Sequence, residues 1–228
     1  ITYNMNVMKN VVCIFAHPDD ESFGCAGTIA LLAQTHNVTI ICATNGDAGE
    51  NHLQNNLSDL GKTRQKELLS SSKILGVQKV HFLNFKDGAL SNNLYHKVAD
   101  AIKPILNDLK PEILLTMEPH GVSGHLDHIA MSMITSYLFR EHSFVKKVMY
   151  FCLGEDQKEA LRKNYFVYTP TPYKLRDIDE TIDVTSVWEL RMKAIHQHKS
   201  QLKDMKFILS MLDIRGKKEH FLVTKRSE

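Results

Sequence analysis

Short apolar runs rich in β-branched residues alternate with longer stretches of helical spacing along the first two thirds of the chain. A short apolar run bounded by turn residues predicts a buried strand, and apolar residues recurring every three or four positions predict a helix. The predicted strands cover residues 11–16, 38–43, 80–83, 113–117 and 147–153, and the predicted helices cover 25–35, 60–75, 94–109 and 127–141. This βαβα order predicts a Rossmann-like α/β fold, with a mostly parallel sheet and helices on both of its faces.

The alternation weakens beyond about residue 155. Residues 165–169, 180–184 and 219–224 have the composition of strands, and residues 187–212 have helical spacing. No repeat, low-complexity tract or linker interrupts the chain. We therefore expect a single domain over residues 1–228 with an elaborated C-terminal part, in which residues 1–9 form an N-terminal tail before the first strand.

The composition argues against a nucleic-acid-binding protein and against a membrane-spanning protein. The net charge is +2, so no basic field indicates a nucleic-acid partner, and no apolar stretch has the length of a membrane span. The four cysteines, at positions 13, 25, 42 and 152, form no CxxC pair. Buried reduced thiols and a cytoplasmic location are expected. Cys25 lies near the first polar cluster, but core packing is the favoured role.

A polar cluster follows the first predicted strand directly. The segment His17-Pro18-Asp19-Asp20-Glu21 brings one imidazole and three carboxylates together. Pro18 cannot donate to a sheet ladder, so the strand ends at about His17. In open α/β sheets, ligands bind beyond the carboxyl ends of strands. The alternative is that these acidic residues only cap the next helix, but so many ionisable groups together would need a cation.

A second cluster follows the predicted strand 113–117. His125, Asp127 and His128 stand at the start of the next helix, and the spacing of the two histidines places them on one face of its first turn. Both clusters therefore follow strand ends and can meet at one edge of the sheet. A catalytic zinc takes three protein ligands and keeps one position open. One imidazole and one carboxylate from the first cluster, with one imidazole from the second, would complete such a site. Taken alone, either cluster is equally well explained as helix-start surface residues.

The two clusters together resemble the LmbE-like (PIG-L-like) N-acetylglucosaminyl deacetylase family. The matching segments are 16–21 and 124–128, and weaker similarity lies in 44–50, 63–67 and 193–201. The resemblance implies the following roles: zinc ligands His17, Asp20 and His128; general base Asp19; a cationic oxyanion stabiliser His125; and Asp127, which would orient or charge-stabilise His125.

Four further residues are candidates for binding the substrate. Arg64 opens the helix after the long loop and could bind sugar hydroxyls, or it could form a solvated pair with Glu67. Asn45 and Glu50 lie in that loop. His198 is on the substrate side, or supports residues that contact the substrate, or lies on a helix surface. Glu21 receives no role.

The resemblance implies a zinc-dependent hydrolase that releases acetate and a free amino sugar from an N-acetylglucosamine-containing small molecule. Three alternatives stay open: a metal-dependent amidase acting on a thiol-conjugate amide, a glycosidase using Asp19 and Asp20, and a non-catalytic sugar-binding protein. A dinucleotide-binding role is disfavoured because residues 24–27 do not form GxGxxG. Fe²⁺ or Co²⁺ would also suit this ligand set. The aglycone stays undefined, and a homo-oligomer is compatible with the sequence.

Overall fold

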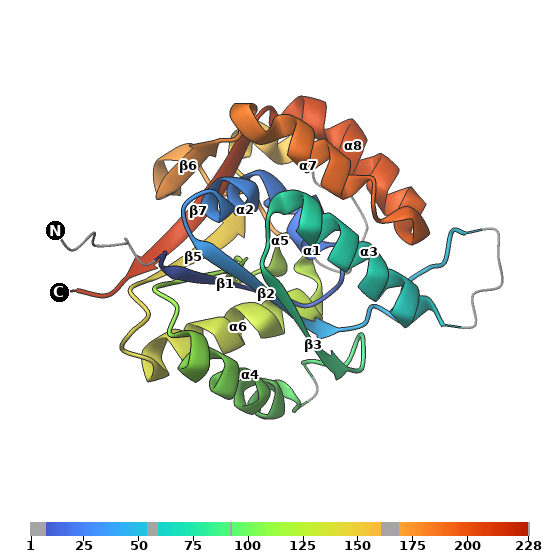
Figure 1. Cartoon of the computed structure of the whole chain (residues 1–228). Helices are drawn as coiled ribbons and strands as arrows, with labels where there is room; N and C mark the ends of the chain where they lie inside the picture. The colour runs from blue at the N-terminus through green and yellow to red at the C-terminus, as the bar shows by residue number, and fades with distance from the viewer. Residues whose placement is uncertain (1–7, 54–58, 92, 161–168, 228) are drawn as a thin grey trace, which may run out of the picture.

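The computed structural model describes residues 8–53, 59–91, 93–160 and 169–227. In these residues a seven-stranded sheet lies between two layers of helices (Figure 1). The strands are β1 (Asn10–Phe15), β2 (Asn37–Thr44), β3 (Lys79–Phe85), β4 (Ile113–Met117), β5 (Lys147–Cys152), β6 (Glu180–Asp183) and β7 (Lys218–Lys225). The α-helices are α1 (Asp20–Phe23), α2 (Ala26–Ala33), α3 (Leu60–Leu75), α4 (Tyr95–Leu109), α5 (Gly121–Gly124), α6 (Leu126–Glu141), α7 (Trp188–Ile195) and α8 (Leu202–Arg215).

The strand order is β3-β2-β1-β4-β5-β7-β6. Strands β1 to β5 pair in parallel, whereas β7 runs antiparallel to both β5 and β6. The Rossmann-like, mostly parallel sheet predicted from the alternating pattern is confirmed, and the C-terminal elaboration consists of β6, β7, α7 and α8. Strand β1 lies between β2 and β4, so the loops that leave β1 and β4 emerge side by side at one edge.

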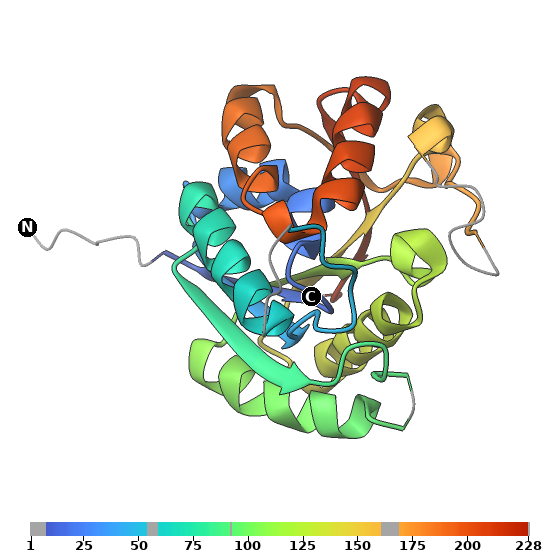
Figure 2. The same cartoon turned by 90° about the vertical axis from the view of Figure 1, so that its right-hand side faces the viewer.

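Alternate residues of β1 build the core on opposite faces of the sheet. Val11, Cys13 and Phe15 pack with Ile29 of α2, while Val12 and Ile14 join a second cluster with α4 and α6. Helices α2, α3, α7 and α8 lie on the first face, and α4 and α6 lie on the second (Figures 1 and 2). Burial on both faces explains why the central strands read as continuous apolar runs. All four cysteines are buried free thiols, and Cys25 is part of the first cluster.

The helix expected over residues 187–212 is interrupted. Helix α7 ends at Ile195 and α8 begins at Leu202, with a short 3₁₀ turn (Lys199–Gln201) before α8. The interruption directs His198 and Ser200 inward, where they bond to Glu21 and Glu67. Most of the strand expected at 165–169 lies outside the described residues.

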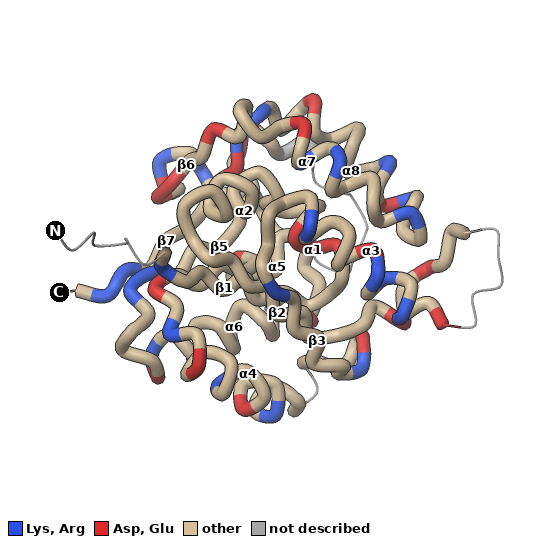
Figure 3. Tube along the Cα trace, viewed as in Figure 1, with Lys and Arg blue, Asp and Glu red and all other residues tan. Residues whose placement is uncertain are grey.

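Charged residues of both signs are interspersed over the fold (Figure 3). This distribution matches the small net charge and shows no single-sign face in the view drawn. Within the described ranges, no helix has the length and apolar character needed to cross a membrane.

Candidate metal centre and active site

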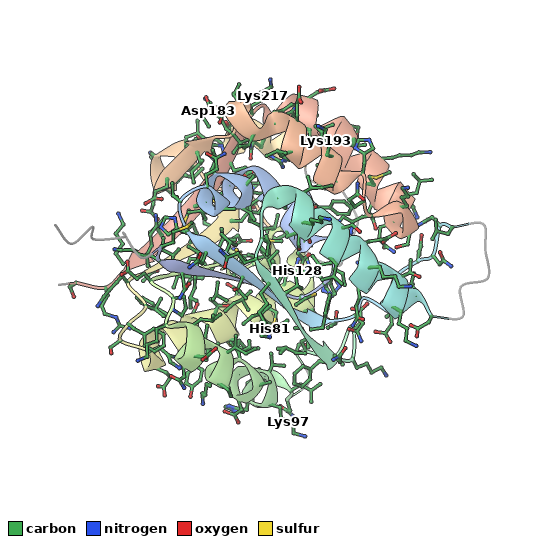
Figure 4. All side chains as sticks on the ribbon, in the orientation of Figure 1. His81, Lys97, His128, Asp183, Lys193 and Lys217 are labelled. Atoms are coloured by element: carbon green, nitrogen blue, oxygen red, sulfur yellow. The ribbon has the colours of Figure 1, made fainter. Side chains whose placement is uncertain are left out.

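The loops after β1 and β4 carry the two polar clusters to the same edge of the sheet. The first loop leads from Ala16 into α1, and the second leads through α5 into α6. His128, on the first turn of α6, lies well inside the outline of the molecule, whereas Lys97 and Lys217 lie at its rim (Figure 4). The predicted meeting of the two clusters therefore follows from the parallel pairing of β1 with β4.

His17, Asp20 and His128 form a compact group, called the metal triad below. His17 Nδ1 lies 3.1 Å from His128 Nε2 and 3.9 Å from Asp20 Oδ2. His128 Nε2 lies 3.1 Å from Asp20 Oδ1. Asp20 Oδ2 accepts from the backbone N–H groups of Ala16 and His17, at 3.0 and 2.9 Å. These backbone bonds fix the carboxylate so that Oδ1 faces His128.

The outer contacts of both histidines assign their protons. His17 Nε2 lies 3.0 Å from Asp87 Oδ1 and 3.3 Å from Asp127 Oδ2, and must therefore carry hydrogen. His128 Nδ1 lies 3.0 Å from the carbonyl oxygen of Gly121, so it too must donate. In the neutral form of each ring, the inner nitrogen would present a lone pair to the other ring and to the Asp20 carboxylate.

Such a convergence of acceptors calls for a positive charge between them. Burial disfavours a charged His17, but the hydrogen bonds to Asp127 and Asp87 outweigh it and raise the pKa of His17 to about 10. A second proton on His17 or a metal ion would supply the missing charge. Two imidazole nitrogens and one carboxylate oxygen are a typical ligand set for zinc with an open position, and also suit Fe²⁺ or Co²⁺. The donor set therefore fits a divalent ion.

Ligand atoms on both sides of His17 lie close enough together to hold an ion. One group combines His17 with His125 and His128, and the other combines it with Asp87 and Asp127, each within 4.8 Å. We assign the second group to orienting His17, because Asp127 already accepts from the N–H groups of Gly88 and Leu90, at 2.8 and 3.0 Å.

Asp19 lies beside the metal triad but is held by other groups. Its Oδ2 accepts from Arg64 Nη2 at 2.8 Å. The same guanidinium donates to the carbonyl oxygens of Gly46 and Pro18, at 2.8 and 3.3 Å. Burial raises the pKa of Asp19 and the charge of Arg64 lowers it, which leaves a pKa of about 6. A carboxyl group with this pKa can accept and return a proton near neutral pH.

His125 is the N-cap of α6, and its Nδ1 accepts from the backbone N–H of Asp127 at 3.1 Å. Nδ1 is therefore unprotonated, and the proton of the neutral ring lies on Nε2. Burial, followed by the charges of His17 and His128, lowers the pKa of His125 to about 4. A cationic His125 stays a prediction, and this arrangement favours a neutral ring that offers an N–H donor at Nε2.

Asp127 contacts both His17 and His125. Its carboxylate accepts from His17 Nε2 and from the backbone N–H groups of Gly88 and Leu90, and its own backbone N–H donates to His125 Nδ1. Its negative charge does act to raise the pKa of His125, but burial and the neighbouring imidazoles outweigh that effect.

A cavity of about 450 Å³ opens next to the metal triad. Its polar lining comprises His17, Asp19, Asp20, Glu50, Arg64, Asp87, Ser123, His125, His128, Thr169, Gln201, Lys203 and Asp204. Its apolar lining comprises Phe23, Ala48, Met117, Val122, Phe151, Leu153, Phe207 and Ile208, with glycines 24, 49 and 88 between them. The cavity is large enough for a sugar-sized ligand whose reacting group reaches the triad.

The four predicted substrate contacts separate into two pairs. Glu50 and Arg64 line the cavity, although the guanidinium of Arg64 is committed to Asp19 and two carbonyl oxygens. Asn45 lies outside the lining and accepts from Gln65. His198 is fully buried, bonds to Glu21 at 2.9 Å and does not line the cavity, which favours a supporting position over a direct substrate contact.

Two buried carboxylates near the metal triad, Asp87 and Glu21, were not given a role by the sequence. Asp87, just after β3, bonds through Oδ2 to the Ala48 N–H at 3.1 Å and through Oδ1 to His17. The sequence signal that could have identified Asp87 was a polar Asp-Gly pair just beyond the carboxyl end of a third strand. Glu21 is fully buried, and its Oε1 accepts hydrogen bonds from Ser22 Oγ, Ser71 Oγ and His198 Nε2.

Comparison with known proteins places the chain in a family. The family model described as PIG-L: GlcNAc-PI de-N-acetylase matches residues 12–139 and covers both polar clusters. The chain belongs to this family. Over 202 residues it is 27% identical to the Bacillus subtilis (strain 168) protein named probable N-acetyl-alpha-D-glucosaminyl L-malate deacetylase 2, which covers 86% of this chain and 85% of that protein.

Two solved structures show how widely the fold is used. N,N'-diacetylchitobiose deacetylase from Pyrococcus horikoshii superposes with a TM-score of 0.72 at 22% identity, covering 95% of this chain and 84% of that chain. The 4-carboxy-2-hydroxymuconate hydratase GalB from Pseudomonas putida KT2440 superposes with a TM-score of 0.68 at 18% identity, covering 97% of this chain and 98% of that chain. Since proteins named for different reactions share this fold, the chemistry must be argued from the site.

Proposed function

We propose that this protein is a zinc-dependent N-deacetylase that acts on a small molecule containing N-acetylglucosamine. The observation that carries the proposal is the convergence of three atoms able to ligate a metal, His17 Nδ1, Asp20 Oδ1 and His128 Nε2, beside a cavity. The family and the name of the B. subtilis relative support an acetamide as the reacting group. The products would be acetate and a free amino sugar.

The residues around the metal triad have complementary roles in amide hydrolysis. A bound divalent ion would lower the pKa of a water molecule and polarise the amide carbonyl. Asp19, held by Arg64, takes the proton from the attacking water. The Nε2–H of His125 donates to the carbonyl oxygen as negative charge develops there. Asp19 then returns the proton to the departing amine, so that one carboxyl group serves as base and then as acid.

The alternative readings fit the site less well. A glycosidase needs two carboxylates on opposite sides of the scissile bond. Here Asp19 is held by Arg64 and Asp20 by backbone N–H groups on the same loop. A protein that only binds sugar has no need for a buried carboxyl group with a pKa of about 6 beside the ligand set. An amidase for a thiol conjugate would use the same residues, so only a screen of substrates distinguishes it from a deacetylase.

The test combines metal analysis with acetate release from a panel of N-acetylglucosaminides, measured with and without chelator. Asp19→Asn should keep the metal and lose roughly a hundredfold or more of turnover. His128→Ala should lose the metal. Asp100→Asn and His96→Ala, exposed positions on α4, are the matched controls and should change neither property. Release of acetate that persists in metal-free protein would overturn the proposal, as would a fully active Asp19→Asn variant.

A further inference from the structure

The cavity has an apolar wall on the side of β5 and α8. Met117, Phe151 and Leu153, from the ends of β4 and β5, are buried in this wall. Phe207 and Ile208 of α8 are half-buried and continue it. A Cβ atom added to Gly24 would meet Met117 Cε at 3.2 Å and Phe151 Cδ1 at 3.4 Å, so the wall lies directly against the turn that ends α1. The apolar wall is therefore continuous with the metal centre.

The charged part of the same cavity is acidic. Among the described lining residues, the carboxylates of Asp19, Asp20, Glu50, Asp87 and Asp204 outnumber the cationic side chains, which are Arg64, Lys203 and, without a metal, His17. Arg64 is already bonded to Asp19 at 2.8 Å, and Lys203 is bonded to Glu50 at 3.3 Å. Addition of a divalent ion would still leave the lining net negative. A carboxylate on the substrate would therefore enter a repulsive field.

We propose that the aglycone of the substrate is an uncharged apolar group, an aryl or alkyl glycoside, that packs against Phe207 and Ile208, and that a dicarboxylate aglycone is disfavoured. This inference rests on the proposed deacetylase function. The acetamide carbonyl must reach the metal triad, so the sugar and its aglycone extend away from it. The half-buried residues of α8 keep contact with solvent and mark the outer part of the cavity, where the aglycone would lie.

The test compares kcat/KM for three substrates: benzyl N-acetylglucosaminide, the malate glycoside of N-acetylglucosamine, and free N-acetylglucosamine. Burial of an aryl group in an apolar pocket should favour the benzyl glycoside over the malate glycoside by about tenfold or more. Raising the ionic strength should lower KM for the malate glycoside, because salt screens repulsion, and leave KM for the benzyl glycoside unchanged. Equal or better hydrolysis of the malate glycoside would overturn the inference.

A matched pair of variants tests whether the aglycone binds against α8. Phe207→Ala should reduce the ratio of kcat/KM for benzyl over free N-acetylglucosamine by about tenfold. Ile214→Ala, on the same helix but 42% exposed and outside the cavity lining, should leave that ratio unchanged. An unchanged ratio in Phe207→Ala would overturn the assignment of α8.

Two further outcomes separate the inference from the function on which it rests. If N-butanoyl and N-octanoyl glucosamine are hydrolysed faster than the acetyl compound, without any preference for the benzyl aglycone, the wall holds the acyl group and the aglycone assignment is wrong. If metal-loaded protein releases acetate from none of the three substrates, the deacetylase proposal itself fails.

Discussion

Arg64 donates to the Asp19 carboxylate across 2.8 Å, and the same guanidinium donates to the carbonyl oxygens of Gly46 and Pro18. One side chain of α3 thus ties together the loop after β1 and the loop after β2. The Arg64 side chain is 5% exposed, so solvent screens its interaction with Asp19 little. Arg64 therefore fixes both the direction and the ionisation of the proposed base.

Arg64→Met should lower kcat by about a hundredfold, because the base loses its orientation. The charge of Arg64 lowers the pKa of Asp19, so removing that charge raises this pKa. Since the base works only when ionised, the acid limb of the pH–rate profile should move to higher pH. Lys62→Met, a 76% exposed position on the same helix, is the control. A variant with wild-type kcat and an unshifted acid limb would show that Arg64 does not act on Asp19.

Asp127→Asn should weaken metal binding by about 10- to 100-fold, as loss of a carboxylate that orients a ligating imidazole typically does. The carboxylate of Asp127 accepts from His17 Nε2 and so directs Nδ1 at the metal position. Competition of the protein with a chromogenic chelator measures the affinity. Asp108→Asn, an exposed position on α4, should bind metal like the wild type. Equal affinities in the two variants would refute the orienting role.

The fold could be predicted from the sequence because each central strand is buried on both faces and therefore consists of a continuous run of apolar residues. Segments with helical spacing separate these runs. The meeting of His17 and Asp20 with His128 followed from the same pattern, since the loops after neighbouring parallel strands share an edge. The proton positions could not be predicted. They depend on the carbonyl of Gly121 and on the Asp127 backbone N–H, whose directions exist only in the folded loop.

His198 shows why the sequence could not define the surroundings of every candidate residue. Helical spacing over residues 187–212 gives no sign of the interruption that directs His198 inward. Its partner, Glu21, lies 177 positions away in the chain, and no local pattern links the two residues. Asp87 could not be recognised for a similar reason. Its contacts with His17 and Ala48 form only in the folded chain, and a single Asp-Gly pair does not reveal them.

Glu21 and His198 form an ionic pair in a fully buried site. Burial opposes the charged imidazole, but the charge and hydrogen bond of Glu21 raise the pKa of His198. His198→Leu leaves the Glu21 carboxylate unpaired and should lower the free energy of unfolding by roughly 3–5 kcal/mol. Replacing both residues, as Glu21→Met with His198→Leu, should recover much of that loss. Urea unfolding of metal-loaded protein provides the measurement.

The solvent-accessible pair of Lys103 with Asp100 supplies the control for this prediction, since Lys103→Ala should leave the free energy of unfolding nearly unchanged. If His198→Leu costs no more than Lys103→Ala, the buried pair does not stabilise the fold through its charges.

Gly46→Ala should impair catalysis out of proportion to its effect on stability. Gly46 has φ +64°, and a Cβ atom there would overlap the guanidinium of Arg64. Gly216 has φ +62° with nothing within 4 Å of such a Cβ atom, so Gly216→Ala carries the backbone strain without the clash. Each substitution should cost roughly 1–3 kcal/mol of stability. Only Gly46→Ala should also displace Arg64 from Asp19 and lower kcat, by about tenfold or more. Urea unfolding and steady-state kinetics on both variants separate the two effects, and equal kcat values would mean that the loop after β2 does not position the base.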